Sequence, residues 1–419
     1  MALAHISWLT AVAMAAGTMI MPLHLSQDTG GIGAAVTRLW GTGTAPVSLL
    51  PGYRRADSAR ENSAIAAGRS AGTRSARSST TPVAATDVWS RLREGFALQG
   101  QPRPAVQAYI DRFRKHPQHI ERVLRRGEPY LFHILGRLEA RGLPAELALL
   151  PVVESAFDPF ASSPAGAAGI WQFMPATASH LGLPRDWWFD GRRDIVAATE
   201  AALDYLDELH GRFDGDWLLA LGAYNAGRTR VNAAIRNNRS RGKPTDFWHL
   251  RLPEETRSYV PKLMALRAVI VDPSAYGIRL PDIANAPYFT SVDTQGQLDL
   301  KVAARLSGAS VEELRRLNPG LVRSVTPPGV SHALLIPKSG ERRFGEQLAR
   351  LSADQRVMAV KYRVRRGDTL STIARSCRTT VERLREINQL TDTRIVAGWH
   401  LIVPVAENDT NAGDAARTS

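Results

Sequence analysis

A single glutamate inside an apolar stretch is the residue whose setting most strongly suggests chemistry. Glu154 lies in the segment LPAELALLPVVESAF (143–157), where leucine, valine and phenylalanine surround it. A carboxyl group in apolar surroundings is desolvated, which favours its protonated form. A carboxyl that stays protonated near neutral pH can act as a general acid and protonate a glycosidic oxygen. The alternative is that Glu154 is a helix-surface glutamate beside core residues.

The next segment carries side chains suited to a sugar-binding cleft. Residues 163–178 read SPAGAAGIWQFMPATA, so two glycines that allow close backbone approach precede aromatic, amide and methionine side chains. The amide of Gln172 can bond to both the donor and the acceptor of an N-acetyl group. The segment therefore favours the interpretation of Glu154 as a catalytic acid.

Two later segments complete a set of motifs. Residues 217–227 (WLLALGAYNAG) predict a buried helix with a C-terminal glycine cap, and residues 252–261 read LPEETRSYVP. The motifs E-S-x-F, S-x-x-G-A-x-G-x-x-Q-F-M-P-x-T-A, A-Y-N-A-G and E-T-R-x-Y-V thus occur in this order. Together they resemble the catalytic domain of the soluble lytic transglycosylase (SLT) family, related to goose-type lysozyme. The resemblance covers roughly residues 88–290, and the flanking sequence is similar to the membrane-bound lytic murein transglycosylase D type.

The resemblance implies a mainly α-helical, lysozyme-like catalytic domain without a cofactor or a metal. It implies cleavage of the β-1,4 bond between N-acetylmuramic acid and N-acetylglucosamine, with a 1,6-anhydromuramyl end as product. Glu154 would be the catalytic residue, acting first as acid and then as base. The remaining motif positions imply substrate-binding roles for Ser163, Gln172, Met174, Tyr224, Asn225, Glu255 and Tyr259.

Several of these residues also fit structural roles. Ser163 precedes a proline and suits a turn, Asn225 suits a helix end, and Glu255 could pair with Arg257 or cap a helix. Asp158, four residues after the glutamate, would be the second carboxylate of a hydrolytic muramidase. Because aspartate before proline is typical of turns, we expect a turn there instead. A hydrolytic muramidase of the same fold and a non-catalytic wall-binding scaffold are the alternative functions.

Helical periodicity dominates the region that must position these residues. From Val88 to about Ala275, apolar residues recur at spacings of three, four and seven, and no run of alternating strand residues is found. We therefore expect a largely helical transglycosylase domain over residues 88–285.

An internal repeat with an offset of 70 residues follows this domain. Residues 300–318 align with 370–388, and each copy ends in a short apolar segment closed by proline. Residues 361–404 resemble a LysM module, which implies a small α+β (βααβ) fold that binds glycans containing N-acetylglucosamine. The first copy, 290–338, has Q-L-D-L in place of G-D-T-L, so we interpret it as a degenerate LysM-like module. The residues implied in glycan binding by the second copy are Gly367, Asp368, Thr369, Arg394 and Ile395.

Charge and composition restrict the partners. The chain of 419 residues has a net charge of +13, which fits a polyanionic partner, and residues 361–404 alone carry nine Lys/Arg against four Asp/Glu. We expect peptidoglycan strands as the partner and not nucleic acid, because no helix-turn-helix, zinc ligands or aromatic-rich sheet accompany the charge. The single cysteine, Cys377, excludes intrachain disulfides and cysteine-ligated clusters, and we expect it to be a small packed residue.

The two ends of the chain differ from the rest. Residues 1–27 hold no charged side chain and include an apolar run ending at Pro22, which predicts a signal-like or membrane-anchoring segment. Residues 28–87 predict a disordered linker rich in Ser, Ala and Arg, and 405–419 a disordered polar tail. We therefore expect an exported protein of the periplasm or cell envelope, which the N-terminal segment would anchor to the membrane if it is not cleaved. Without a cysteine after the apolar run, we expect no lipobox attachment.

Overall fold

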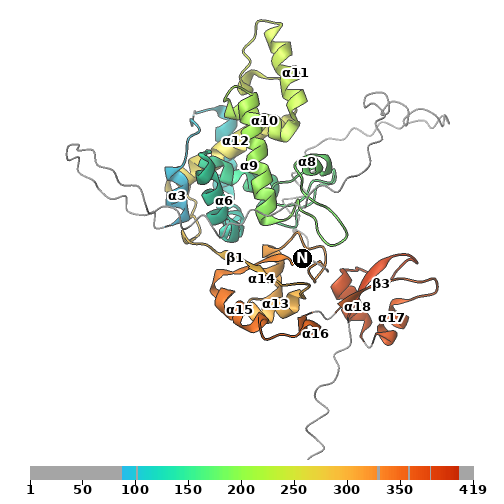
Figure 1. Cartoon of the computed structure of the whole chain (residues 1–419). Coiled ribbons are helices and arrows are strands. Elements are labelled where there is room, and N and C mark those ends of the chain that lie inside the picture. The colour runs from blue at the N-terminus through green and yellow to red at the C-terminus, as the bar shows by residue number, and fades with distance from the viewer. Residues whose placement is uncertain (1–86, 101, 328–330, 357–358, 378, 405–419) are drawn as a thin grey trace, which may run out of the picture. The chain divides into compact units, whose positions relative to one another are not determined.

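A computed structural model describes residues 87–100, 102–327, 331–356, 359–377 and 379–404 (Figure 1). The segment expected at 1–27, the tail expected at 405–419 and nearly all of the linker expected at 28–87 lie outside the described residues. Among the helices within the described ranges, none combines the length and the apolar character needed to cross a bilayer.

The first part of the structure is helical, as the periodicity predicted. Its helices and 3-10 turns are α3 (Val88–Glu94), α4 (Pro104–Lys115), α5 (Pro117–Arg126), α6 (Glu128–Arg141), η2 (Ala145–Leu149), α7 (Leu150–Ser155), α8 (Pro175–His180), α9 (Ile195–Arg212), α10 (Trp217–Ala226), α11 (Arg228–Arg239), η3 (Phe247–His249), α12 (Glu254–Val271) and η4 (Ser274–Tyr276). Aspartates cap the N-termini of α9 and α10, and α4, α5 and α6 each have proline in the first turn. These are ordinary helix-start signals.

One apolar core joins these helices. Helix α10 packs against both α9 and α12, and α12 also packs along α4; the labelled helices can be followed in Figure 1. The largest fully buried side chains include Trp171, Tyr130 and Phe157, the last two stacked with ring centroids 6.4 Å apart. Burial of such side chains contributes about 1.5–3 kcal/mol each, so the core fixes α7 and α12 against their neighbours.

The first repeat copy forms a small α+β module. Strands β1 (Phe289–Asp293) and β2 (Ala333–Pro337) pair antiparallel with Ser291 opposite Leu335, and α13 (Leu300–Ser307) and α14 (Val311–Leu317) lie between them in sequence. After η5 (Lys338–Gly340), helix α15 (Glu341–Leu348) buries Phe344 and Leu348 in the same core. The compact unit therefore continues past residue 338.

The second copy repeats the βααβ order. After the short α16 (Ala353–Arg356) come β3 (Ala359–Arg363), α17 (Leu370–Ser376), α18 (Val381–Asn388) and β4 (His400–Pro404), with β3 and β4 antiparallel. Cys377 is partly buried and packs against the core of this module. The expectation of a mainly helical domain followed by two small α+β modules is confirmed.

An asparagine holds each module together in the same way. Asn318 donates its side-chain amide to the carbonyls of Leu314 (2.8 Å) and Leu335 (2.7 Å), and its side-chain oxygen accepts from the Leu335 N–H (2.8 Å). Asn388 makes the equivalent three bonds with Leu384 and Ile402. Because both asparagines are buried, these bonds lock the second helix of each module to its last strand.

The two modules differ in the loops that precede the first helix and follow the second. In the first module these loops are joined: Leu300 N–H donates to the Ser324 carbonyl (2.8 Å), and Thr326 N–H donates to the Leu298 carbonyl (2.9 Å). Asp299 bridges to Val325 between them, and both are fully buried. In the second module the two loops are bonded only beside the strands, where Val364 N–H donates to the Trp399 carbonyl (2.7 Å) and Gly398 N–H donates to the Val364 carbonyl (2.8 Å). Residues 365–367 and 391–394 are exposed, and no backbone bond joins these two stretches among the described residues.

Candidate active site

Glu154 is placed by a short helix with an unusual end. Helix α7 has six residues, and Ala156 and Phe157 directly after it adopt left-handed conformations with φ of 52° and 54°. Such conformations are uncommon for residues other than glycine and are kept only where the surroundings hold them. Phe157 is fully buried, and Ser155 donates its hydroxyl toward the carbonyls of Pro151 (3.0 Å) and Ile170 (3.1 Å). The end of α7 is thus fixed to the segment that carries Gln172.

The carboxyl group of Glu154 faces a tyrosine. The Tyr259 hydroxyl, from α12, donates to Glu154 Oε1 at 2.6 Å. Burial raises the pKa of Glu154 to about 7; the Tyr259 hydrogen bond and the charge of Lys262 oppose this rise, and the charge of Glu255 adds to it. Burial also raises the pKa of Tyr259 well above its usual value, so the phenol stays a neutral donor. Glu154 remains partly accessible, as a proton donor to substrate must be.

A second glutamate of the same apolar segment has a different environment. Glu146, in η2, is fully buried and accepts hydrogen bonds from the backbone N–H groups of Ala97 (3.0 Å) and Leu98 (2.9 Å). Its Oε1 also lies 3.0 Å from Nε of Arg267 on α12. A buried carboxylate paired in this way is structural. The Glu146–Arg267 pair ties η2, and so α7, to the helix that carries Tyr259.

The glycine-rich loop that carries Gln172 is held by its own backbone. Gln172 has a left-handed φ of 49°, and its Nε2 donates to the Gly169 carbonyl at 2.8 Å. Gly169 packs so closely that a Cβ would lie 2.2 Å from the Arg192 carbonyl oxygen, which explains why glycine stands there. The buried Arg192 donates to the Gly166 carbonyl (2.6 Å) and forms a bidentate pair with Asp190. Sequence reasoning missed Arg192 and Asp190, which stabilise the loop from outside the motifs.

The helix α10 brings two predicted residues to this region. The Tyr224 hydroxyl donates to the Trp171 carbonyl (3.0 Å), next to Gln172. Burial and the nearby charge of Glu154 raise the pKa of Tyr224 well above its usual value. Asn225 accepts a hydrogen bond from the Thr256 hydroxyl (2.7 Å), which joins the end of α10 to the start of α12.

The other predicted cleft residues differ in solvent exposure and in their contacts. Met174 is 41% exposed. Ser163 Oγ accepts from the Ala167 N–H (3.0 Å), so this serine does form a turn. Glu255 is exposed on α12, and no ion pair with Arg257 occurs among the described residues.

Asp158 has the environment of a turn residue. Its Oδ1 accepts from the Phe160 N–H at 2.9 Å, two residues along the chain. This local bond is the Asx turn expected of an aspartate before a proline. The side chain is thereby used in shaping the chain after α7.

The predicted glycan loop of the second module is shaped by the residues named for it. Gly367 has a φ of 91°, Thr369 caps α17, and Asp368 Oδ2 accepts from the Tyr362 hydroxyl (2.9 Å) and the Arg365 N–H (2.6 Å). In the loop between α18 and β4, Arg394 is exposed, whereas Ile395 is partly buried and packs against the module core. Trp399, 47% exposed, is an aromatic surface that the sequence motifs did not single out.

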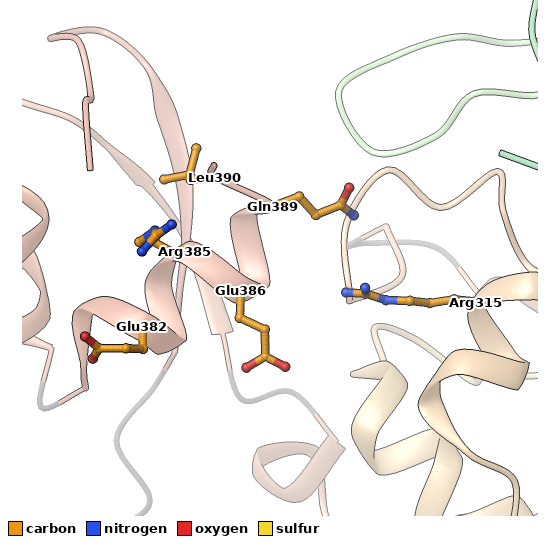
Figure 2. Close-up of a pocket in the computed structure, with 6 residues that line it drawn as sticks. All are labelled: Arg315, Glu382, Arg385, Glu386, Gln389 and Leu390. Atoms are coloured by element: carbon orange, nitrogen blue, oxygen red, sulfur yellow. The ribbon is translucent and has the colours of Figure 1, made fainter. Parts of the chain in front are cut away.

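A separate pocket has other residues in its lining. It is lined by Arg315 of α14 and by residues of α18 and the turn after it, namely Glu382, Arg385, Glu386, Gln389 and Leu390 (Figure 2). Figure 2 shows acidic and basic side chains interspersed around it, and none of them is a predicted site residue. Among the described residues, no group of His, Cys, Asp and Glu is arranged to hold a metal ion.

Comparison with known proteins agrees with this geometry. The family model "Transglycosylase SLT domain" matches residues 137–247, which contain Glu154, Gln172 and Tyr224. The models "Lytic transglycosylase MltD, LysM-like domain" and "LysM domain" match 288–353 and 362–404. Membrane-bound lytic murein transglycosylase D of Escherichia coli K12 is 36% identical over 327 residues, covering 76% of this chain and 72% of that protein. The chain belongs to the membrane-bound lytic murein transglycosylase D family.

More distant relatives match a smaller part of the chain. Soluble lytic murein transglycosylase of Salmonella typhimurium is 32% identical over 120 residues, which is 27% of this transglycosylase and 18% of that protein. The crystal structure of the 70 kDa soluble lytic transglycosylase of E. coli is 29% identical, with a TM-score of 0.27, and covers 30% of this chain and 22% of that one. The sequence-based identification as a lytic transglycosylase with LysM modules is confirmed by the family matches.

Proposed function

We propose that this transglycosylase cleaves the β-1,4 bond between N-acetylmuramic acid and N-acetylglucosamine in peptidoglycan, and that it leaves 1,6-anhydromuramyl ends. The observation that carries the proposal is the partly accessible Glu154 carboxyl, which accepts a hydrogen bond from the Tyr259 hydroxyl (2.6 Å) and has a pKa raised to about 7. Near neutral pH a large fraction of this group is protonated, as a general acid requires, and its ionised form is available as a base.

The reaction needs one protein carboxyl in two successive roles. Glu154 gives its proton to the glycosidic oxygen, the bond from that oxygen to the muramyl anomeric carbon breaks, and the 2-acetamido oxygen of the substrate stabilises the positive charge. The Glu154 carboxylate then takes the proton of the muramyl C6 hydroxyl, whose oxygen bonds to the anomeric carbon. The proton balance closes, no water is consumed, and Glu154 is regenerated as the acid.

Tyr259 acts with the acid in this scheme. Its hydroxyl donates to the carboxyl, and this bond strengthens as negative charge develops on Glu154 during proton transfer. Because burial keeps the phenol neutral, it remains a donor throughout the working pH range.

The hydrolytic alternative would need a second carboxylate, and neither candidate that the sequence motifs offer has a suitable setting in the described structure. Glycosidases that use two carboxyl groups hold them on either side of the scissile bond. Asp158 accepts a backbone N–H in a turn, and Glu255 is an exposed residue of the first turn of α12. The names of the family relatives favour the same choice, since they are transglycosylases.

We assign the remaining motif residues to the cleft. Gln172 uses its amide N–H on its own loop, which leaves its carbonyl oxygen to accept from an acetamido N–H. Ser163 accepts through its oxygen and keeps its hydroxyl proton for a sugar oxygen. Met174, which is 41% exposed, forms an apolar wall, while Tyr224 and Asn225 shape the floor from α10.

The C-terminal modules serve wall binding in this proposal. The second module, with its open loops around Gly367 and Arg394, binds glycan containing N-acetylglucosamine, and its net positive charge favours the acidic wall polymer. The transglycosylase domain occupies 88–285 in this division. We further propose that the protein is exported and works in the cell envelope; the E. coli relative is named as membrane-bound.

Mass spectrometry of the products tests the proposal. Purified sacculi digested in water enriched in oxygen-18 should give muropeptides with anhydro ends and no incorporated label. Glu154→Gln, which keeps the shape but can neither donate an acidic proton nor act as base, should release none while retaining its circular dichroism spectrum. Labelled reducing ends from the wild type would instead identify a muramidase.

A further inference from the structure

A lysine beside the catalytic acid has no role in the scheme above. Lys262 lies on α12 three residues after Tyr259 and seven after Glu255, a spacing that places all three on one face of the helix. Tyr259 touches Glu154 from this face. Lys262 thus lies one helical turn from the tyrosine that contacts Glu154, and the charges of Lys262 and Glu154 act on one another.

This ammonium group is half-buried without a carboxylate against it. Among the described residues, no carboxylate oxygen lies within 4.0 Å of Lys262 Nζ, which instead lies 5.7 Å from the ring centroid of Tyr109 on α4. Burial lowers its pKa, and the charge of Arg112 on α4 lowers it further, against the opposing influence of Glu255 and Glu154. The positive charges of Lys262 and Arg112 thus act on one another. Partial burial of an ammonium costs free energy unless an anion compensates it.

The substrate class proposed above carries an anion in one place of its repeat. Of the two alternating sugars, only N-acetylmuramic acid bears a lactyl group, whose acid is either free or linked to a stem peptide that has carboxylates of its own. N-acetylglucosamine bears no ionisable group. A cation next to the acid thus distinguishes the two sugars by charge. This decides which of the two kinds of β-1,4 bond in the strand is presented to Glu154.

We propose that Lys262 is a specificity-determining residue that binds a carboxylate of the muramyl substituent and so sets the register of the glycan strand over Glu154. This inference rests on the proposed function. Arg112, on α4, increases the positive potential around Lys262. Before substrate binds, the Lys262 ammonium group makes a weak cation–π contact with the Tyr109 ring. The contact with substrate is charge-assisted and partly solvated, so its loss should weaken binding about tenfold.

Steady-state kinetics on paired substrates test the proposal. Lys262→Met should raise KM about tenfold on native glycan strands and leave kcat nearly unchanged. On strands whose carboxyl groups have been converted to amides with carbodiimide and ammonia, wild type and Lys262→Met should have the same KM. Lys262→Arg should restore most of the binding, and Lys243→Met, which removes an exposed lysine of the same domain, should change nothing.

Two further arms identify the anion. Strands freed of stem peptides by an amidase expose the lactyl acid alone, whereas native strands present peptide carboxylates. If the KM difference between wild type and Lys262→Met persists on peptide-free strands, the lactyl acid is the ligand. If it disappears there but is present on native strands, a stem-peptide carboxylate is the ligand.

Three outcomes would overturn the proposal. A fall in kcat with a shifted pH profile and unchanged KM would mean that Lys262 acts through the protonation of Glu154. If Lys262→Met raises KM on amidated strands as much as on native strands, Lys262 has a packing role. If Lys262→Met does not fold, the wild-type enzyme alone still tests the inference, because its KM should be higher on amidated strands than on native strands and should rise with ionic strength. If neither increase in KM is observed, the inference is refuted. Reducing ends from the wild type would refute the proposed function and leave the KM comparison readable.

Discussion

Replacing Tyr259 by phenylalanine tests how the acid is tuned. The change removes the hydroxyl that donates to Glu154 Oε1 at 2.6 Å and keeps the buried ring. A hydrogen bond to a charged group contributes about 1.5–3 kcal/mol, and one pKa unit corresponds to about 1.4 kcal/mol. The bond stabilises the ionised form, so its loss should raise the pKa of Glu154 by about 1–2 units, from about 7.

The pH dependence of kcat/KM makes this shift measurable. Because the acid must be protonated, activity should fall on the alkaline side through the pKa of Glu154, and in Tyr259→Phe this fall should move upward by the same 1–2 units. The low-pH plateau should decrease about tenfold, since part of the same free energy stabilises the charge that develops on Glu154 in the transition state. The assay is release of anhydromuropeptides from sacculi between pH 5 and 9.

A second buried tyrosine provides the control. Tyr130 also donates its hydroxyl, to the Arg316 carbonyl at 2.9 Å, and has no hydrogen bond to the acid. Tyr130→Phe should lower the melting temperature without moving the alkaline fall. If folded Tyr259→Phe keeps the wild-type fall, or shifts it to lower pH, the reasoning about Glu154 is refuted.

Three other expectations concern the acid, its neighbour and the modules. The pKa of Glu154 is raised from an ordinary 4.5 to about 7 in the folded state, so wild-type stability is highest at low pH and decreases as the pH rises from 4.5 to 7. Glu154→Gln should therefore be more stable than wild type at pH 8, by at most about 3 kcal/mol. Equal free energies of unfolding in urea would contradict this. Asp158→Asn should keep most of the activity because an amide oxygen can still accept the Phe160 N–H, whereas a loss as deep as that of Glu154→Gln in folded protein would favour two catalytic carboxylates. Deleting 355–419 should weaken sacculus pull-down and spare turnover on a soluble glycan tetramer, since tethering raises local concentration only; unchanged pull-down would show that the second module is not the anchor.

The sequence predicted Glu154 as the acid, but it did not show how the setting of Glu154 differs from that of Glu146. Glu146 and Glu154 both lie among leucines and valines of one segment, and composition alone treats them alike. Their difference comes in part from Arg267, which is 121 residues away from Glu146 along the chain and forms an ion pair with it. Nonlocal partners of this kind depend on helix packing, which local patterns do not contain.

Some features of the backbone could also not be predicted from the sequence. Helix periodicity and the repeat were enough to predict the mainly helical domain and both α+β modules, because these depend on local spacing. The left-handed conformations of Ala156 and Phe157 were not predictable, since neither residue type favours them. The hydrogen bonds that join Leu298 and Leu300 to the later loop were likewise missed, because they depend on pairing between separated segments.

The asparagines of the two modules act as substitutes for a neighbouring strand. A two-stranded sheet is marginal by itself, because each strand has one partner. The side-chain amide of Asn318 presents an N–H and a C=O to Leu335, and Asn388 does the same for Ile402, just as a third strand would. These bonds stabilise the contact between the second helix and the last strand of each module and involve neither surface loop, so the two loops are free to diverge. A duplicated module can in this way keep its architecture while one copy closes those loops and the other leaves them open.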